Sequence, residues 1–217
     1  MNDVAILDYK MGNLFSVQCA LNFVGIKSVI TDDIEIIENS KSIVIPGVGA
    51  YPEAMNRIRE KKFDKIIYEF NEKKRLIVGI CLGMQLLFSE SFEIKKTKGL
   101  GLLKGEVKKF HEKKQNGDTA SFNVGWNEIL LNSKEKIKNN YLNNLNKKKM
   151  YFIHSYHVNT FEKSINTSSS FFYKKKFVSS VEKDNICGFQ FHPEKSGPYG
   201  LKIYKNLRKK INYESTI

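Results

Sequence analysis

The feature that most constrains the fold of this 217-residue chain is an alternation of short apolar runs with amphipathic stretches along its first hundred residues. The run at residues 76–80, Leu-Ile-Val-Gly-Ile, is too short for a helix and apolar throughout, which is typical of a parallel strand buried on both faces. Elsewhere apolar residues recur at helical spacing, as at Leu14, Val17, Leu21 and Val24. This alternation predicts an α/β fold with a central, mostly parallel sheet flanked by helices.

The same patterns give approximate element positions. Strands are expected at residues 4–7, 28–31, 42–45 and 76–80, and helices from residue 14 to Gly25, over 55–70 and from Cys81 through Phe88. The second half is less regular, and it is expected to add antiparallel strands. Strand candidates lie at 124–130, 151–158, 171–181 and 186–191, a closing helix is expected over 200–211, and polar surface segments at 111–121 and 132–149. Because the sequence contains no repeat or linker, residues 1–217 are expected to form a single domain.

The formal net charge of +13 raises the question of a nucleic-acid ligand. The charge is almost all lysine, spread along the whole length, and no zinc-finger or RNP-type pattern is present. A lysine-rich solvated surface explains the charge, so no nucleic-acid partner is expected. The sequence has no signal-peptide pattern and no apolar run near the roughly 18 residues of a membrane span, so no membrane association is expected either.

Three cysteines, Cys19, Cys81 and Cys187, include no C-x-x-C pair. Their odd number and spacing argue against a disulfide framework and a structural zinc site, and they fit a reducing cytoplasm. No metal or cofactor is expected.

Cys81 lies in the pattern G-x-C-x-G, formed with Gly79 and Gly83 between an expected strand and an expected helix. Such a turn holds a nucleophile in a strained backbone, and a side chain at either glycine would collide with the turn. The helix N-terminus favours a thiolate and can hold an oxyanion. Taken alone, the pattern also fits a small buried cysteine beside two packing glycines.

His192 is the histidine that best supplies a base for this thiol. It follows an expected strand, precedes Pro193 and stands two residues before Glu194. Because proline favours extended backbone at the preceding residue, the imidazole and the carboxylate can project the same way, and the carboxylate can orient the ring. Cys81, His192 and Glu194 are therefore the candidate nucleophile, base and orienting group.

A third strand end carries Pro46-Gly47-Val48-Gly49, which by itself also fits an ordinary Pro-Gly turn. Its flexible backbone could turn the N–H of Val48 toward a reacting carbonyl and, with the N–H of Leu82, complete an oxyanion hole. In parallel sheets ligand chemistry gathers at the carboxyl ends of strands, where all three elements are expected.

Together these residues resemble class I glutamine amidotransferase domains and, within that family, the glutaminase subunit of imidazole glycerol phosphate synthase. The similarity extends over nearly the whole chain: DYKMGN at 8–13, PGVG at 46–49, GICLGMQ at 79–85, GLGL at 99–102, GWN at 125–127, HSY at 154–156 and QFHPEKS at 190–196. The resemblance implies a flavodoxin-like fold, hydrolysis of glutamine to glutamate and ammonia by Cys81, His192 and Glu194, and passage of the ammonia to a (β/α)8-barrel cyclase in histidine biosynthesis.

The resemblance also implies binding residues. Positions that hold glutamine in the family match Gly49, Gln85, Glu93 and the backbone of His154, Ser155 and Tyr156. Positions that dock on the barrel match Asn13, Trp126, Asn127 and Lys195, although Trp126 read alone could equally be a core aromatic residue.

Two residues depart from the family pattern: Lys10 stands where glycine is usual, and Phe122-Asn123 stands where a Pro-His pair is usual. Both lie near the expected docking face, so they bear on the partner rather than on the chemistry. Three alternatives remain open: a paralogous subunit that supplies ammonia to a nucleotide-linked or surface-polysaccharide sugar, a partner-free peptidase or γ-glutamyl hydrolase with the same triad, and a non-catalytic subunit that retains the fold.

Overall fold

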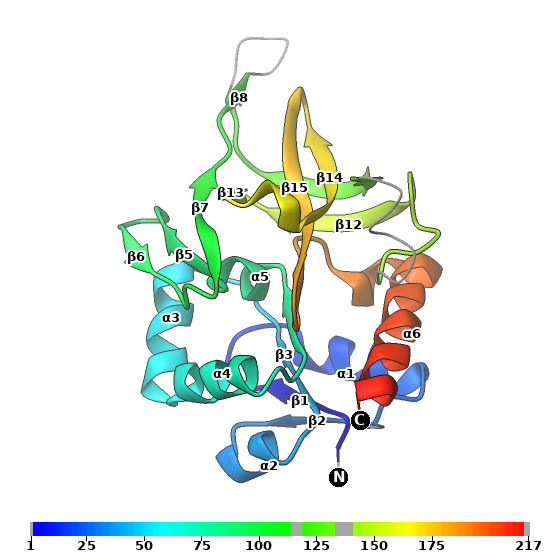
Figure 1. Ribbon diagram of the computed structural model, residues 1–217. Coiled ribbons are helices and arrows are strands. Elements are labelled where there is room, and N and C mark those ends of the chain that lie inside the picture. The colour runs from blue at the N-terminus through cyan, green and yellow to red at the C-terminus, as the bar shows by residue number, and fades with distance from the viewer. Residues whose placement is uncertain (1, 114–118, 133–140, 215–217) are drawn as a thin grey trace.

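The computed structural model describes residues 2–113, 119–132 and 141–214 (Figure 1). Its centre is an eight-stranded sheet in the order β11-β14-β15-β16-β4-β3-β1-β2. Five strands run parallel: β2 (Ser28–Thr31), β1 (Val4–Leu7), β3 (Ser42–Ile45), β4 (Ile77–Ile80) and β16 (Ile186–Phe189). With β16 as the fifth strand, their order is the 2-1-3-4-5 of flavodoxin-like folds, which confirms the expected fold class. Antiparallel strands β15 (Lys175–Lys183), β14 (Asn166–Phe172) and β11 (Leu130–Leu131) extend the sheet.

Helices bury both faces of the central parallel strands, which explains why β1, β4 and β16 are buried at every position and contain no charged side chain. Val4 and Ile6 pack in one cluster with α1 (Leu14–Phe23) and α6 (Gly197–Glu214). Ala5 and Leu7 point to the opposite face, where α2 (Ile34–Glu38), α3 (Tyr51–Glu60), α4 (Phe63–Glu72) and α5 (Leu82–Leu86) cover the sheet. Figure 1 shows these two groups of helices on opposite sides of β1 and β3.

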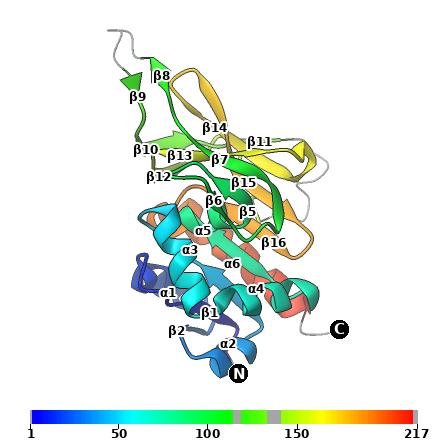
Figure 2. The same cartoon turned by 90° about the vertical axis from the view of Figure 1, so that its left-hand side faces the viewer.

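A second β layer lies beyond the carboxyl ends of β3 and β4 (Figures 1 and 2). It contains a four-stranded sheet in the order β13-β7-β5-β6, and the antiparallel pairs β10–β12 and β8–β9. The bounds are β5 (Phe88–Ser91), β6 (Thr97–Lys98), β7 (Leu103–Lys109), β8 (Glu112–Lys113), β9 (Thr119–Ala120), β10 (Asn123–Glu128), β12 (Lys149–His154) and β13 (Tyr156–Thr160). The short helices η1 (Lys163–Ile165) and η2 (Pro193–Lys195) complete the fold.

Two helix predictions were wrong in detail. The helix expected over 55–70 is two helices, α3 and α4, separated at Lys62, which has a left-handed φ of 59°. The spacing of the apolar residues is consistent with this break, because Ile58 and Phe63 are five residues apart and cannot share one helical face. The helix after Cys81 ends at Leu86, and Phe88 begins β5. Because residues 82–88 are all buried, their apolar side chains do not alternate with polar ones at the spacing of a helix or of a strand, and the sequence does not reveal where the helix ends.

Two strand predictions were also wrong. Residues 151–158 form two strands, because β12 pairs with β10 while β13, after Ser155, pairs with β7. Residues 171–181 contain a hairpin turn at Tyr173, whose φ is 51°. The turn consists of Tyr173 and Lys174 and contains neither the glycine nor the asparagine that is usual in such a turn. The polar segments expected at 111–121 and 132–149 lie partly outside the described residues.

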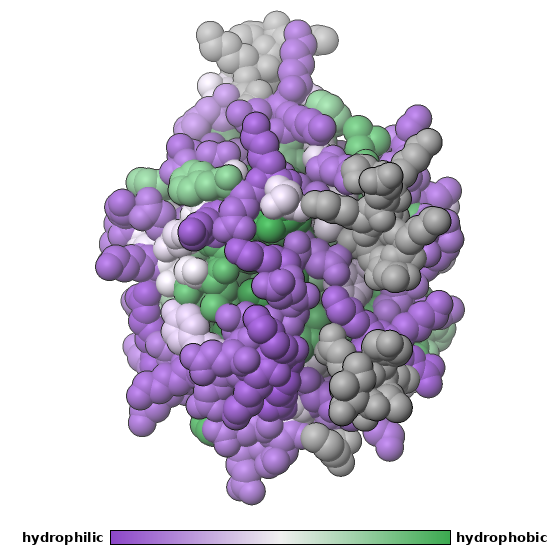
Figure 3. Space-filling view, in the orientation of Figure 1, coloured by the Kyte–Doolittle hydropathy of each residue, from purple (hydrophilic) through white to green (hydrophobic). Residues whose placement is uncertain are grey.

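The surface in Figure 3 is mainly hydrophilic, with hydrophobic atoms showing in a hollow near the middle of the view. Among the described residues, none of the helices combines the length and the hydrophobicity that a membrane span requires.

Candidate active site

Cys81 occupies a sharp turn between β4 and α5. Its backbone angles, φ 53° and ψ −109°, are strained for a residue with a side chain. A Cβ on Gly83 would lie 1.8 Å from the carbonyl oxygen of Ile45, and one on Gly79 would lie 2.7 Å from Cα of Met84. Only glycine fits at these two positions, as the G-x-C-x-G pattern predicted. The turn has the form of a nucleophile elbow.

Three neighbouring parallel strands carry the predicted catalytic elements. Strands β3, β4 and β16 are adjacent in the sheet, and their carboxyl ends lead into Pro46, Cys81 and His192, respectively. The backbone N–H of Cys81 donates to the carbonyl of Phe189 at 2.7 Å, so the end of β16 is fixed beside the cysteine. The topology therefore brings together elements more than a hundred residues apart in sequence.

His192 and Glu194 form a buried pair. His192 Nδ1 lies 2.7 Å from Glu194 Oε1, and the two side chains are 3% and 2% exposed. The backbone of His192 is extended, as predicted from the following proline, and its N–H donates to the carbonyl of Tyr151 at 2.9 Å. Nε2 of His192 makes no hydrogen bond among the described residues. This nitrogen is therefore available to exchange a proton with a thiol or a bound molecule.

The charge state of His192 reflects its neighbours. Burial alone would lower its pKa, but the negative charges of the Cys81 thiolate and the Glu194 carboxylate, together with the hydrogen bond to Glu194, outweigh burial and raise the pKa to about 10. The arrangement favours the protonated imidazolium of His192, which can act as a proton donor at neutral pH.

A cavity of about 340 Å³ opens in front of Cys81. Its described lining consists of Val48, Gly49, Cys81, Leu82, Gln85, Glu93, Phe122, Ile153, His154, Ser155 and Tyr156. The structure therefore gathers around one cavity all the residues predicted to hold glutamine or its oxyanion. His192 and Glu194 are not part of this lining, and sequence analysis did not predict Phe122 and Ile153.

Gln85 and Gln190 link the cavity wall to the cysteine. Gln85 Nε2 donates to the carbonyl of Tyr156 at 2.9 Å and to Gln190 Oε1 at 3.0 Å. Gln190 Nε2 lies 3.8 Å from Cys81 Sγ, within hydrogen-bonding range for sulfur. Gln190 belongs to the sequence motif at 190–196, which by itself indicates no role for this residue. Its position two residues before His192 was the available signal, because alternate residues of an extended segment share a side.

Glu93 provides the one carboxylate among the described lining residues. It follows β5, and its Oε2 accepts a hydrogen bond from the backbone N–H of Tyr51 at 2.8 Å. Burial raises the pKa of Glu93, while this hydrogen bond and the positive charge of Lys109 oppose the shift. A carboxylate in this position can bind the ammonium group of an amino acid.

The side chain of His154 has a structural role. Burial lowers its pKa to about 3, so the ring is neutral, and its nitrogens contact the carbonyl of Tyr156 at 2.8 Å and Asn123 Nδ2 at 3.1 Å. Because Asn123 donates to Nε2, Nδ1 carries the proton and donates to Tyr156. The His154 side chain thus fixes the backbone of residues 154–156, and this backbone is what the sequence predicted to contact glutamine.

The loop after β3 is held close to the elbow. The hydroxyl of buried Tyr9 donates to the carbonyl of Pro46, and a Cβ on Gly47 would lie 2.8 Å from Leu82 Cβ. Beyond this anchor, Val48 is 43% exposed. Leu82 is the first residue of α5, where a backbone N–H has no acceptor within the helix. Both predicted oxyanion donors therefore border the cavity.

The four residues predicted to dock on a partner lie near η2 and the start of α1. Trp126 is 52% exposed, so it is not a core residue, and its ring packs edge-on against Tyr151 at 5.9 Å. Lys195 Nζ lies 5.9 Å from the centre of the same Tyr151 ring. Asn13 caps α1, which packs against η2. Asn127 lies on β10 beside Trp126.

Alternate residues along β10 form an exposed apolar row. Phe122, Val124 and Trp126 are each more than half exposed. Asn123 and Asn127 lie on the other side of the strand: Asn127 Nδ2 donates to Asn123 Oδ1 at 2.9 Å, and Asn123 contacts His154. Hydrogen bonds thus run from the exposed strand to the cavity wall.

Comparisons with known proteins agree with this geometry. The family model of class I glutamine amidotransferases matches residues 7–210. The chain is 38% identical, over 96% of its own length and 99% of the relative's, to the imidazole glycerol phosphate synthase subunit HisH of Oceanobacillus iheyensis. It is 40% identical to the HisH subunit of Sulfurimonas denitrificans over 96% of its length and 99% of that chain.

Solved structures show the same fold. The structure of PurLQS from Thermotoga maritima matches with a TM-score of 0.73 at 20% identity, over 97% of this chain and 100% of that chain. A crystal structure of a glutamine amidotransferase matches with a TM-score of 0.69 at 17% identity, over 99% of this chain and 100% of that chain. The family model and the HisH relatives show that the chain belongs to the class I glutamine amidotransferase family, in the group of the HisH subunits.

Proposed function

We propose that this chain is the glutaminase subunit of an imidazole glycerol phosphate synthase, acting as a single domain over residues 1–217 in the cytoplasm. The observation that best supports this proposal is that three features lie together: the strained Cys81, the buried His192–Glu194 pair and a cavity lined by Gln85 and Glu93. The near full-length similarity to HisH subunits supports the choice of pathway.

In the proposed reaction the Cys81 thiolate attacks the side-chain carbonyl carbon of glutamine. The N–H groups of Val48 and Leu82 stabilise the resulting oxyanion. The C–N bond then breaks, and the leaving nitrogen takes a proton from His192 and departs as ammonia. This leaves a γ-glutamyl thioester on Cys81, which water attacks with His192 as base, and the C–S bond breaks to release glutamate and regenerate the thiolate.

Glutamine binding follows from the polar groups of the cavity. Glu93 binds the ammonium group, and Gln85, Gly49 and the backbone of Ser155 and Tyr156 bind the remaining polar atoms. Since burying a small zwitterion without partners is costly, these contacts select an amino acid with an amide side chain.

The partner is a (β/α)8-barrel cyclase that docks over Asn13, Trp126, Asn127 and Lys195 and receives the ammonia. An exposed row of Phe122, Val124 and Trp126 beside a polar rim has the composition of a protein interface. Neither nucleic acid nor a membrane has a part in this function.

The test is reconstitution with a histidine-pathway cyclase. We expect slow glutamine hydrolysis by the chain alone, a large increase with the cyclase and its acceptor, and formation of imidazole glycerol phosphate. Full glutaminase activity without the cyclase would contradict the partner-dependent model. Normal hydrolysis without transfer of ammonia to the histidine intermediate would instead point to another acceptor, such as a nucleotide-linked sugar.

A further inference from the structure

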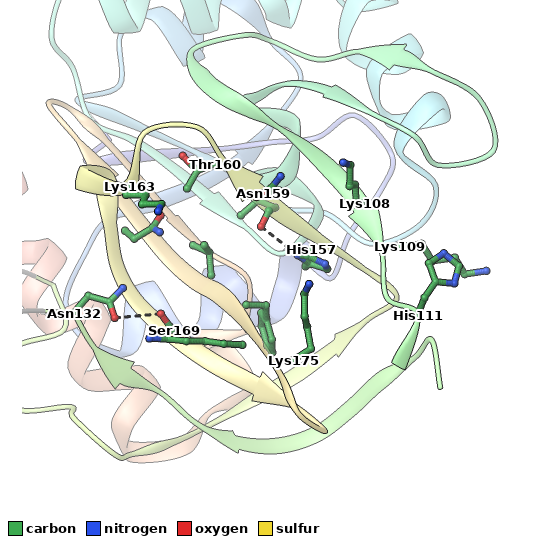
Figure 4. A pocket seen from close by; sticks show the side chains of 15 residues that line it. Lys108, Lys109, His111, Asn132, His157, Asn159, Thr160, Lys163, Ser169 and Lys175 are labelled. Carbon is green, nitrogen blue, oxygen red and sulfur yellow. Dashed lines mark hydrogen bonds between the residues drawn. The ribbon is translucent and has the colours of Figure 1, made fainter. Parts of the chain in front are cut away.

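A second and larger cavity lies away from Cys81, between the β7–β13 strands and the β14–β15 hairpin (Figure 4). Its volume is about 730 Å³, within the range of small-molecule sites. Residues of β13 from His157 to Thr160 line it, whereas Tyr156 of the same strand lines the cavity at Cys81. The two cavities therefore share one strand and have otherwise separate linings.

The larger cavity is cationic. Its described lining includes Lys108, Lys109, Lys163, Lys175 and Lys176, and no described lining residue carries a carboxylate. Lys108 Nζ pairs with Glu106 Oε1 at 2.6 Å, just outside the lining. The other four lysines form no ion pair with any described residue. We name this space the lysine cavity.

The positive charge converges on a buried ring. Burial lowers the pKa of His157, and the charges of Lys175 and Lys108 lower it further, against a hydrogen bond to the carbonyl of Val158. Figure 4 shows Lys175 reaching toward His157, with Lys163 and Asn132 on the opposite side of the cavity. Lys108 and Lys175 therefore act on the same ring, whereas the charge of Lys109 also acts on Glu93 of the cavity at Cys81.

Other polar residues of the lining already have partners within the protein. Asn132 Oδ1 accepts a hydrogen bond from Ser169 Oγ at 3.2 Å, and Asn159 Nδ2 donates to Glu106 Oε1 at 3.0 Å. Val158 and Phe177 give the cavity an apolar floor. The lysines are therefore the groups that would dominate binding of a ligand here.

We propose that the lysine cavity binds a small, multiply charged phosphate compound, of the polyphosphate or nucleotide class. A single carboxylate would leave several ammonium groups unpaired, whereas two or more phosphoryl groups match the lysines. This site is independent of the proposed glutaminase reaction, and its failure would leave that reaction untouched.

The test is isothermal titration calorimetry on the whole chain at low and physiological salt, with ATP, pyrophosphate, inorganic phosphate and citrate as probes. We expect one saturable site for ATP and pyrophosphate, weaker binding of inorganic phosphate and citrate, and at least about tenfold weaker ATP binding by the Lys108→Gln/Lys175→Gln variant.

A matched control is Lys27→Gln/Lys65→Gln, which removes the same charge from exposed positions outside the cavity. It should bind ATP within about twofold of the parent chain. Equal weakening by both pairs, tighter binding of citrate than of pyrophosphate, or binding of an oligonucleotide that the cavity variant does not weaken would each overturn the proposal. Circular dichroism on both variants checks that they fold, and a single Lys175→Gln variant replaces the pair if it does not.

Discussion

The side-chain amide of Asn123 lies 3.1 Å from Nε2 of His154 and thereby joins the exposed strand β10 to the wall of the cavity at Cys81. Asn123 also accepts from Asn127, and His154 donates to the carbonyl that anchors Gln85. A change on the exposed face of β10 therefore has a continuous set of hydrogen bonds through which to reach the cavity at Cys81.

Asn123→Ala removes both contacts of this amide and frees the buried ring of His154. We expect kcat/KM for glutamine to fall about tenfold, mainly through KM, because the backbone of residues 154–156 loses its support. Steady-state kinetics with the cyclase present measure this, and Asn123→Gln should recover part of the loss. Asn56→Ala, on the exposed face of α3, is the control. An unchanged KM in Asn123→Ala would rule out the positioning role.

His192 should titrate far above an ordinary histidine. NMR of the ring is expected to give a raised pKa in the parent chain and a lower one in Cys81→Ala and in Glu194→Gln, since each variant removes a negative charge. A ring pKa that stays the same in both variants would contradict the assignment of its causes.

The same shift makes stability depend on pH. A histidine whose pKa rises from about 6.5 in the unfolded chain to about 10 in the folded chain stabilises the fold fully below about pH 6.5. This contribution is lost as the pH rises through the folded pKa. Denaturant unfolding of the parent chain should therefore show stability decreasing from pH 7 to 10 more steeply than in Glu194→Gln, and parallel profiles would count against the prediction.

Gly83→Ala should be among the most damaging single substitutions, because the new Cβ would meet the backbone of Ile45 at 1.8 Å. We expect a loss of about 3 kcal/mol or more in unfolding free energy, or failure to fold. Gly101→Ala provides a comparison: its Cβ meets nothing within 4 Å, and only its φ of 68° opposes the change. That variant should lose about 1 kcal/mol. If urea unfolding gave similar losses of unfolding free energy for Gly83→Ala and Gly101→Ala, the close approach of Gly83 to the Ile45 carbonyl would be refuted.

Trp126→Ala tests the docking face. A half-exposed tryptophan packed on Tyr151 is suited to be an anchor, so we expect the affinity for the cyclase to fall by about 2 kcal/mol or more, measured by calorimetry. Phe161→Ala removes another exposed aromatic residue and should leave the affinity unchanged. Equal affinities of the Trp126→Ala variant and the parent chain would place the interface elsewhere.

The sequence predicted the parallel sheet because β1, β3 and β4 are apolar on both faces, a pattern that few other structures share. It predicted the elbow because Gly79 and Gly83 are required by contacts within the turn and with the neighbouring strand β3. The breaks at Lys62 and Tyr173 were missed because lysine and tyrosine adopt left-handed angles there without any local signal.

The sequence predicted the individual residues of the site but not the hydrogen bonds that connect them. Cys81, His192 and Glu194 could be proposed from local motifs and strand ends, whereas the contacts of Gln190 with Cys81 and of Asn123 with His154 join residues 109 and 31 positions apart. No local pattern encodes such contacts, because they depend on how the second β layer packs over the sheet.

The central claim is that Cys81 is the nucleophile. The most direct measurement is ammonia release from glutamine by Cys81→Ala in the presence of the cyclase, with the buried Cys187→Ala variant as control. We expect ammonia release at the background rate from the folded Cys81→Ala variant and near-parental release from Cys187→Ala. Ammonia release by Cys81→Ala at the parental rate would contradict it.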